Sequence, residues 1–181
     1  ADYATAKGLE ITITAQHVLP EELKDLPDCP IINPADKRNN YPCPFLAGVG
    51  VSFKLISALL FKSNLSDKQK QLIAEKCLDL VAVGTIADMV SLLGENRLLV
   101  KKGLEVLNEN RRLGLKELIN STKANGDKKL EAWNVSWQIA PRLNAASRLS
   151  HANTAFALLT TTDENEACLL YTSPSPRDRT R

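Results

Sequence analysis

The chain opens with Ala1-Asp-Tyr-Ala-Thr-Ala-Lys-Gly-Leu-Glu-Ile-Thr-Ile-Thr14. Residues Ala1 to Lys7 have the pattern of a helix end, and Gly8 stands where glycine is favoured just past a helix. Leu9 to Thr14 alternates and is β-branched, which is typical of a strand. A helix, a glycine and a strand in this order form half of a β-α-β unit, so the opening predicts an α/β fold with a parallel sheet.

The rest of the chain is predicted to be mostly helical. A second short strand is expected over Cys29 to Ile32, before a loop rich in Pro, Asn and Asp. From Leu46 the apolar residues recur every three or four positions, which predicts a helix. Ser66 is a good N-cap for the next helix, which we expect to continue towards Thr85. Further helices are expected at Glu95 to Leu107, Leu113 to Ile119 and Ala152 to Leu159, with a polar loop at Asn125-Gly-Asp127.

The composition is ordinary for a globular protein, with 44% hydrophobic and 24% charged residues in a chain of 181. No apolar run approaches the roughly 20 residues that a bilayer crossing needs, so we expect no membrane partner. Aromatic residues make up only 5%, which argues against a large base-stacking surface. The cysteines lack C-x-x-C pairing, which predicts reduced thiols in a cytoplasmic protein rather than a zinc site or disulfide framework.

The formal net charge of +2 belongs to the C-terminal tail. Arg177, Arg179 and Arg181 exceed the single Asp178 by this amount, and the charges of the remaining residues cancel. Any nucleic-acid binding must therefore rest on local basic patches rather than on overall charge.

The two ends of the chain do not resemble natural ends. Residues Cys168 to Asp178 resemble the translated sequence of an adapter used to prepare sequencing libraries, and Pro174 and Pro176 exclude a helix there. We therefore expect residues 168–181 to be a non-native tail without functional meaning. Ala1 is not an initiator methionine, so we expect the chain to be a fragment.

Two single residues are candidates for chemistry. His17 follows the first predicted strand, at the edge where parallel sheets usually bind ligands, although position alone favours an ordinary loop histidine. Asp88 lies in an almost wholly apolar run, and an ionised carboxylate buried there needs a cation, a metal or several N–H donors. An aspartate that caps a helix or lies exposed at a bend is the equally weighted alternative.

A third candidate is the segment Ile139-Ala-Pro-Arg-Leu-Asn-Ala-Ala-Ser-Arg148, which we interpret as a loop of small residues. Its arginines suit bidentate contact with phosphate, whereas ordinary solvated arginines are the simpler interpretation. Trp133 and Trp137 are four residues apart, and we expect them in the core rather than in a base-stacking platform. His151 is assigned no chemistry.

The order of several longer motifs is more informative than any single residue. They are Ile31-Ile-Asn-Pro34, Leu46-Ala-Gly-Val-Gly-Val-Ser-Phe-Lys54, Asp79-Leu-Val-Ala-Val-Gly-Thr-Ile-Ala-Asp-Met-Val90, Gly94-Glu-Asn-Arg97 and Ala140-Pro-Arg-Leu-Asn-Ala-Ala-Ser-Arg148. Over nearly all of Ala1 to Ala167 the chain resembles the RecJ family of single-strand-specific exonucleases, within the DHH phosphoesterase superfamily. The resemblance implies a bacterial, cytosolic enzyme of DNA repair and recombination that degrades single-stranded DNA from the 5′ end with two Mn²⁺ or Mg²⁺ ions.

The resemblance also implies roles for the candidate residues. Asp88 corresponds to the family's late aspartate metal ligand, and carboxylates suit Mn²⁺ and Mg²⁺. His17 corresponds to the histidine that contacts the reacting phosphate. Arg142, Asn144 and Arg148 are assigned to the nucleic-acid backbone. The earlier aspartate ligands of the family are expected before the first residue of this chain.

The chain departs from the family at its namesake motif. Where the family has Asp-His-His, this sequence has Ala15-Gln16-His17. Gln16 replaces an imidazole ligand by an amide, a poorer ligand for a transition metal, and Ala15 removes the carboxylate that would orient the site. Ser147 replaces the usual glycine of the Asn-Ala-Ala-Gly-Arg stretch. Both a degenerate homologue and errors in the sequence at residues 15 and 16 explain these differences.

These observations predict the C-terminal half of a DHH-type α/β domain, a parallel sheet with helices that continues into a helical region. The latter part of the phosphoesterase domain is expected over 1–90, the helical remainder leading to an interdomain linker over 91–167, and the non-native tail over 168–181. The fragment itself is expected to be inactive. The alternatives are a DHH phosphoesterase of oligonucleotides or small phosphorylated nucleotides, and a degenerate nucleic-acid-binding domain.

Overall fold

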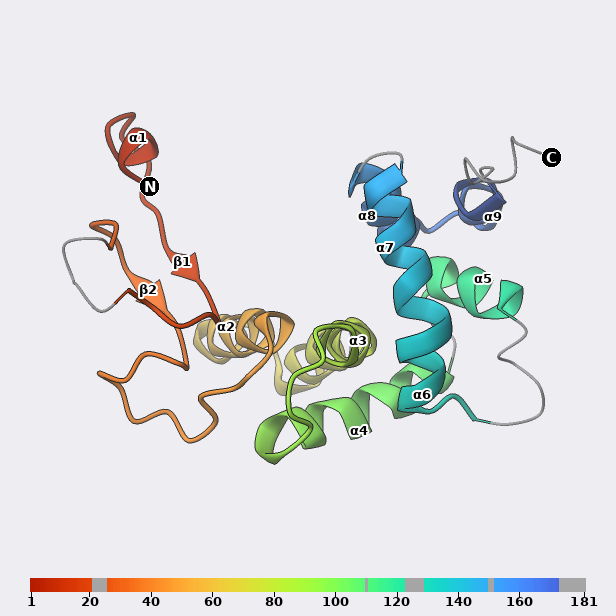
Figure 1. The fold of residues 1–181 in the computed structure, drawn as a ribbon, viewed down its shortest axis with the longest axis horizontal. Helices are drawn as coiled ribbons and strands as arrows, with labels where there is room; N and C mark the ends of the chain where they lie inside the picture. The colour runs from red at the N-terminus through yellow and green to blue at the C-terminus, as the bar shows by residue number, and fades with distance from the viewer. Residues whose placement is uncertain (21–25, 110, 123–128, 150–151, 173–181) are drawn as a thin grey trace.

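Figure 1 shows a computed structural model of the chain, which describes residues 1–20, 26–109, 111–122, 129–149 and 152–172, with the backbone alone at 146–149 and 171–172. It is largely helical, with a small parallel sheet near the N-terminus, so the predicted α/β class is confirmed. The elements are α1 (Asp2–Thr5), β1 (Ile13–Thr14), β2 (Ile31–Ile32), α2 (Gly48–Lys62), α3 (Asp67–Ala87), α4 (Gly94–Asn108), α5 (Leu113–Ser121), α6 (Ala132–Asn134), the π-helix η2 (Val135–Ile139), α7 (Ala140–Leu149), α8 (Ala152–Thr160) and α9 (Glu164–Thr172).

The two strands lie side by side and run in the same direction, as predicted. Ile13 is paired with Ile31, and the backbone N–H of Ala15 donates to the carbonyl of Ile32 at 3.0 Å. Both strands are shorter than expected, because backbone pairing between them is confined to these few positions. Gly8 has a φ of 76°, the left-handed conformation expected of a glycine just past a helix. Because the two strands are parallel, their carboxyl ends lie at the same edge of the sheet.

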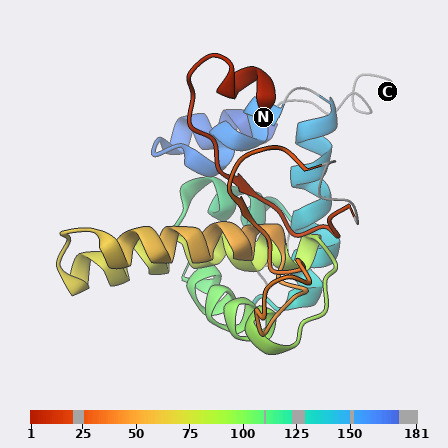
Figure 2. The ribbon, with the colours of Figure 1, turned by 90° about the vertical axis from the view of Figure 1, so that its left-hand side faces the viewer.

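The helices α2 and α3 form an antiparallel hairpin that extends away from the body of the molecule in Figure 2. Ser66 caps α3 as predicted, because its hydroxyl accepts the N–H of Gln69 and the side chain of Gln69 accepts the N–H of Ser66. The two helices approach closely at Gly84, where an added Cβ would lie 2.6 Å from a methyl group of Val49. A side chain larger than hydrogen at position 84 would separate the helices.

A second close approach joins α3 to α4. An added Cβ on Gly103 would lie 2.2 Å from the carbonyl oxygen of Leu78, so only glycine lets the two backbones meet there. Around this contact lies the main core cluster, which draws on α3, α4, α5 and η2. Its buried members are Val83, Ile86, Val100, Leu107, Leu115, Leu118, Ile119, Leu130, Val135 and Ile139.

Asn96 fixes the loop that leads into α2. Its side chain is fully buried and donates to the carbonyls of Phe45 at 2.9 Å and Ser91 at 3.0 Å. Its Oδ1 also accepts the N–H of Ala47, the N-cap of α2. Because one amide satisfies three backbone groups, the start of α2 is held against the start of α4.

Arg112 connects elements that are far apart in the sequence. Its guanidinium makes a forked ion pair with Asp79 on α3, Nε to Oδ2 at 2.8 Å and Nη2 to Oδ1 at 3.2 Å. It also donates to the carbonyls of Leu159 on α8 and Lys76 on α3, both at 2.9 Å. The side chain of Asp79 is only 6% exposed, so its charge relies on this partner.

The segment that we predicted as a small-residue loop is helical, and that prediction is wrong. In Figure 1 α6, η2 and α7 form one continuous helix that stands beside α3 and α5. Pro141 cannot donate a hydrogen bond and its ring would press on the carbonyl of Trp137, four residues earlier. The helix widens into η2 just before this proline, where the N–H of Ala140 bonds to the carbonyl of Val135. The π-turn therefore accommodates Pro141 without ending the helix.

The expectation of no helix from Cys168 onward is wrong for residues 168–172, whereas the assignment of 168–181 to a non-native tail stays a prediction. Helix α9 continues through Thr172, and Ala167 within it is fully buried against the body of the molecule. Pro174 and Pro176, on which the expectation depended, lie outside the described residues, as do His151 and the predicted loop at Asn125–Asp127. In the part of the chain that the structure describes, no helix is both long and apolar enough to cross a membrane.

The role of Arg112 can be tested against its neighbour. We expect Arg112→Ala to lower the free energy of unfolding by about 3 kcal/mol, because it leaves the buried carboxylate of Asp79 without a cation. Arg111→Ala is the matched control: the pair of Arg111 with Glu109 is about half exposed on both sides, and its loss should cost roughly 0–1 kcal/mol. Urea unfolding of both variants measures the difference. Equal losses of unfolding free energy would contradict the role of Arg112 as the partner of the buried Asp79.

Candidate functional site

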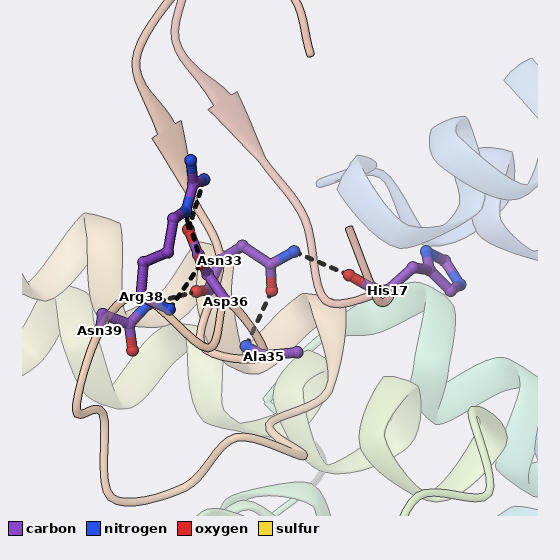
Figure 3. Close-up of polar contacts among 6 residues, drawn as sticks. All are labelled: His17, Asn33, Ala35, Asp36, Arg38 and Asn39. Atoms are coloured by element: carbon purple, nitrogen blue, oxygen red, sulfur yellow. Dashed lines mark hydrogen bonds and ion pairs between the residues drawn. The ribbon is translucent and has the colours of Figure 1, made fainter. Parts of the chain in front are cut away.

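The carboxyl edge of the sheet is organised by Asn33. This side chain is buried, directly after β2, and its Nδ2 donates to the backbone carbonyl of His17 at 2.8 Å. Its Oδ1 accepts the N–H of Ala35 at 2.9 Å, and its own carbonyl accepts Nδ2 of Asn39 at 2.9 Å. Figure 3 shows these contacts linking the loop after β1 to the loop after β2. Asn33 thus sets the path of the backbone at the edge where α/β sheets bind ligands.

The loop after β2 carries an ion pair of its own. The guanidinium of Arg38 donates to both carboxylate oxygens of Asp36, at 2.9 Å from Nε to Oδ1 and 2.7 Å from Nη2 to Oδ2. The hydrogen bond from the Arg38 side chain holds the pKa of Asp36 below its usual range. Both charges are therefore satisfied within the loop rather than presented to a ligand.

His17 has its backbone held and its imidazole exposed. In Figure 3 the ring points away from Asn33 and from the loop after β2. The structure therefore presents this side chain to solvent at the sheet edge, the place that sequence reasoning gave it.

Gln16 lies against the first turn of α2. A Cβ added to Gly48 would lie 2.7 Å from Oε1 of Gln16 and 3.2 Å from its Nε2. A larger residue at position 48 would therefore displace the end of the Gln16 side chain. The amide at position 16 occupies the space between the sheet edge and the start of α2.

Asp88 is exposed at the C-terminal cap of α3, so of the two equally weighted interpretations the exposed aspartate at a helix end is confirmed and the buried carboxylate is not. Its N–H bonds to the carbonyl of Gly84 at 3.0 Å, and the next residue, Met89, has a positive φ of 57°. No described cation pairs with its carboxylate. Across the described residues, no three His, Cys, Asp or Glu side chains come together as a metal site. The donors that are present therefore do not hold a metal cluster by themselves.

The three residues assigned to the nucleic-acid backbone lie on α7. Arg142 is exposed, and its Nη1 donates to the carbonyl of Gln138 one turn earlier at 2.7 Å. Asn144 is also exposed, whereas the side chain of Arg148 is outside the described ones. All three residues thus belong to one helix, α7, whereas His17 is at the sheet edge and Asp88 is at the end of α3.

Trp133 and Trp137 are on the surface, and the expectation of a core position is wrong. Their exposed fractions are 59% and 69%. The side of the helix that faces the core is taken by Val135 and Ile139, both fully buried. This second apolar pair has the same four-residue spacing as the tryptophans, so spacing alone did not indicate which pair faces inward. The exposed indoles are a feature of the site that sequence reasoning missed.

A cavity of about 560 Å³ lies between β2, the following loop and α2. Tyr41 and Lys54 line it, and both bond to Glu95 at the start of α4, with Lys54 Nζ 2.7 Å from Oε1. Burial alone would raise the pKa of Glu95, but the hydrogen bonds from Lys54 and Tyr41 outweigh it and lower that pKa. Burial, together with the bond to Glu95, raises the pKa of Tyr41.

Comparison with known proteins places this geometry in context. No family model matches the chain. The chain is 42% identical over 168 residues to the single-stranded-DNA-specific exonuclease RecJ of Bacillus subtilis, covering 92% of this chain and 20% of the relative. It is 35% identical over 187 residues to RecJ of Escherichia coli, covering 99% of this chain and 32% of that one.

Solved structures agree with the sequence matches. A crystal structure of exonuclease RecJ bound to manganese matches 93% of this chain with 40% of its own, at a TM-score of 0.76 and 34% identity. RecJ of Thermus thermophilus in complex with Mn²⁺ matches 92% of this chain and 23% of its own, at a TM-score of 0.74 and 35% identity.

Sequence and fold together define the class: this α/β segment is homologous to single-stranded-DNA-specific exonucleases. We therefore place the chain in the RecJ family, as the counterpart of one segment of those proteins. The chain spans between a fifth and a third of the length of these curated relatives.

The role of Asn33 predicts a local effect on the His17 loop. Asn33→Ala should lower the free energy of unfolding by about 1–3 kcal/mol, because the partly buried carbonyl of His17 and N–H of Ala35 each lose a hydrogen bond. Backbone amide exchange should accelerate at residues 15–18 more than in α3. Asn39→Ala is the control, since Asn39 is exposed and its bonds, to the carbonyl of Asn33 and the N–H of Tyr41, lie within the loop after β2 rather than at the His17 loop. Uniform exchange changes throughout the chain would contradict the positioning role.

The Glu95 cluster predicts a pH dependence. Because the folded-state pKa of Glu95 is lowered, its stabilising contribution is present above its ordinary value of 4.5 and is lost as the pH falls through the folded-state pKa. Glu95→Gln should therefore cost up to about 1 kcal/mol at pH 7, a small effect because Lys54 is 45% exposed, and less near pH 3, below the ordinary pKa of the group. Urea unfolding at both pH values measures this, and a constant difference would contradict it.

Proposed function

We propose that the protein to which this segment belongs is a metal-dependent exonuclease that degrades single-stranded DNA from the 5′ end. The observation that carries the proposal is the match of nearly the whole chain to RecJ bound to manganese, in fold and in sequence. The relatives are named as single-stranded-DNA-specific exonucleases, and two of the solved RecJ structures hold Mn²⁺. A cytoplasmic role in DNA repair and recombination forms part of this proposal.

Within that enzyme we assign three roles to this segment. Asp88 is a metal ligand, because its carboxylate is exposed at the end of α3 and no described cation neutralises it. His17 contacts the reacting phosphate, because its ring is presented at the carboxyl edge of the sheet. Arg142, Asn144 and Arg148 contact the nucleic-acid backbone, which the exposure of Arg142 and Asn144 on α7 supports.

The metal ions supply neutralisation of charge on the reacting phosphate when they are bound. The described residues do not form a metal cluster, so this segment contributes ligands to a site that other residues must complete. We expect the isolated chain to degrade no DNA.

A non-catalytic nucleic-acid-binding protein is the second candidate, and Ala15 and Gln16 favour it. The amide of Gln16 is packed on Gly48 where the family motif has an imidazole ligand. With alanine at 15 and glutamine at 16, the imidazole ligand of the family motif and the carboxylate that orients it are both absent from these positions.

A chimera tests the proposal. Residues 1–167 of this chain would replace the matched segment of Bacillus subtilis RecJ, with and without Ala15→Asp plus Gln16→His. On 5′-phosphorylated single strands with Mn²⁺ we expect the unrepaired chimera to be weakly active. The repaired chimera should be faster by more than the roughly 10–100-fold that loss of an orienting partner alone typically costs, because the ligand and its orienting group are both restored.

Controls separate chemistry from folding. Asp88→Ala in the repaired chimera should abolish turnover while thermal stability and DNA binding persist. Asp67→Ala, an exposed aspartate at the opposite end of α3, should leave turnover unchanged. An unrepaired chimera as fast as the repaired one would remove the role of residues 15 and 16. A folded, repaired chimera without activity would favour the non-catalytic candidate.

A further inference from the structure

The two tryptophans of the chain form an exposed pair on one helix. The chain holds no other tryptophan. Trp133 is 59% and Trp137 69% exposed, and they are four residues apart across α6 and η2. At the α-helical rise of about 1.5 Å per residue, their Cα atoms are at most about 6 Å apart along the helix axis. Tryptophan is large and is usually well buried, so two exposed indoles one turn apart require an explanation.

The helix that carries the pair contains basic but no acidic residues, and the exposed Glu131 caps its start. From Ala132 to Leu149 the sequence contains two arginines and neither aspartate nor glutamate. Arg142 is exposed, and the one described group that its guanidinium bonds is a backbone carbonyl. Its charge is therefore available to an anion. Lys129 and Glu131 are both exposed just before α6 and have opposite charges, so the positive charge near the pair comes from the arginines of α7.

We infer that Trp133 and Trp137 form a stacking platform for unpaired bases, with Arg142 taking a phosphate of the same strand. The inference rests on the proposed function and names where the single strand lies. Sequence-tolerant binding of single strands combines a positive surface that follows the backbone with aromatic side chains on which successive bases stack. This helix carries both components.

The spacing favours a single strand over a duplex. Bases stacked on one strand of a duplex are separated by about 3.4 Å, whereas the Cα atoms of the two tryptophans are up to about 6 Å apart along the helix. Each indole therefore takes its own base from an extended strand. The lack of acidic side chains on α6, η2 and α7 favours a polyanion over a basic protein segment as the occupant.

The backbone keeps the indoles outward. Val135 and Ile139 are fully buried in the core cluster on the other side of the same turns. The π-turn that accommodates Pro141 contains Trp137 and lies between Trp133 and Arg142. Replacing either indole by a smaller side chain therefore removes surface and leaves the core intact, so variants should remain folded.

Intrinsic fluorescence provides the test, since all tryptophan emission comes from this platform. The 181-residue chain is titrated with a short oligothymidylate at low salt, and emission should be quenched and shifted on binding. The single-tryptophan variants Trp133→Phe and Trp137→Phe should each retain quenching and near-normal affinity, because phenylalanine also stacks. Trp133→Ala and Trp137→Ala should each weaken binding by roughly five- to a hundredfold, measured by anisotropy of labelled DNA.

Controls address charge, exposure and the occupant. Arg142→Ala should weaken binding and reduce the slope of log affinity against log salt by about 0.7. Phe156→Ala removes an aromatic residue that is 67% exposed on α8 and should leave the affinity unchanged. Duplex DNA of the same sequence should bind with less quenching.

Two results overturn the inference: binding of the oligonucleotide without a change in tryptophan emission, or equal affinities for the Trp→Ala and Phe156→Ala variants. The proposed function fails independently of this, in the turnover assay of the chimera. If the repaired chimera is active and its Trp133→Ala and Trp137→Ala variants keep wild-type affinity, the platform is wrong and the function stands. If the chain shows the expected quenching and the repaired chimera is inactive, the platform stands as part of a binding protein.

Discussion

One guanidinium, that of Arg112, joins the N-terminal and C-terminal parts of the molecule. Its forked pair with Asp79 requires α5 to begin against α3, and its bond to the carbonyl of Leu159 brings the end of α8 to the same point. An added Cβ on Gly114 would overlap the carbonyl of Leu158, so α5 and α8 are in direct backbone contact there. The helices that follow α4 can pack on the core only with this geometry.

The position of the exposed tryptophans depends on that packing. Once α5 is docked on α3, the core cluster has room for one side of the helix that runs from α6 to α7, and Val135 and Ile139 occupy it. The opposite side must then face solvent. Pro141 adds a second constraint, because the π-turn before it changes which residues follow one another along the surface.

The sheet edge is built by different means. A sheet of two short strands supplies few backbone bonds. The side chain of Asn33 ties the two following loops together through the carbonyl of His17, and its bond to the N–H of Ala35 shapes the loop after β2. The backbone of His17 is therefore held in place and its ring is exposed, while the side chain of Gln16 packs against the first turn of α2. The edge presents a phosphate-binding candidate beside a position whose side chain is already engaged.

The sequence by itself predicted the α/β class, the parallel pairing, the Ser66 cap and the helices α2 to α5 and α8, because local periodicity and capping chemistry determine these features. The sequence also identified the resemblance to the RecJ family, because a segment of the protein is long enough to contain several extended motifs in their characteristic order. Only the tertiary structure decided that Asp88 is exposed, that Ile139 to Arg148 is helical and that Trp133 and Trp137 face outward. The physical reason is that two apolar pairs with identical spacing compete for one core surface, and the choice between them depends on helices that the local sequence does not contain.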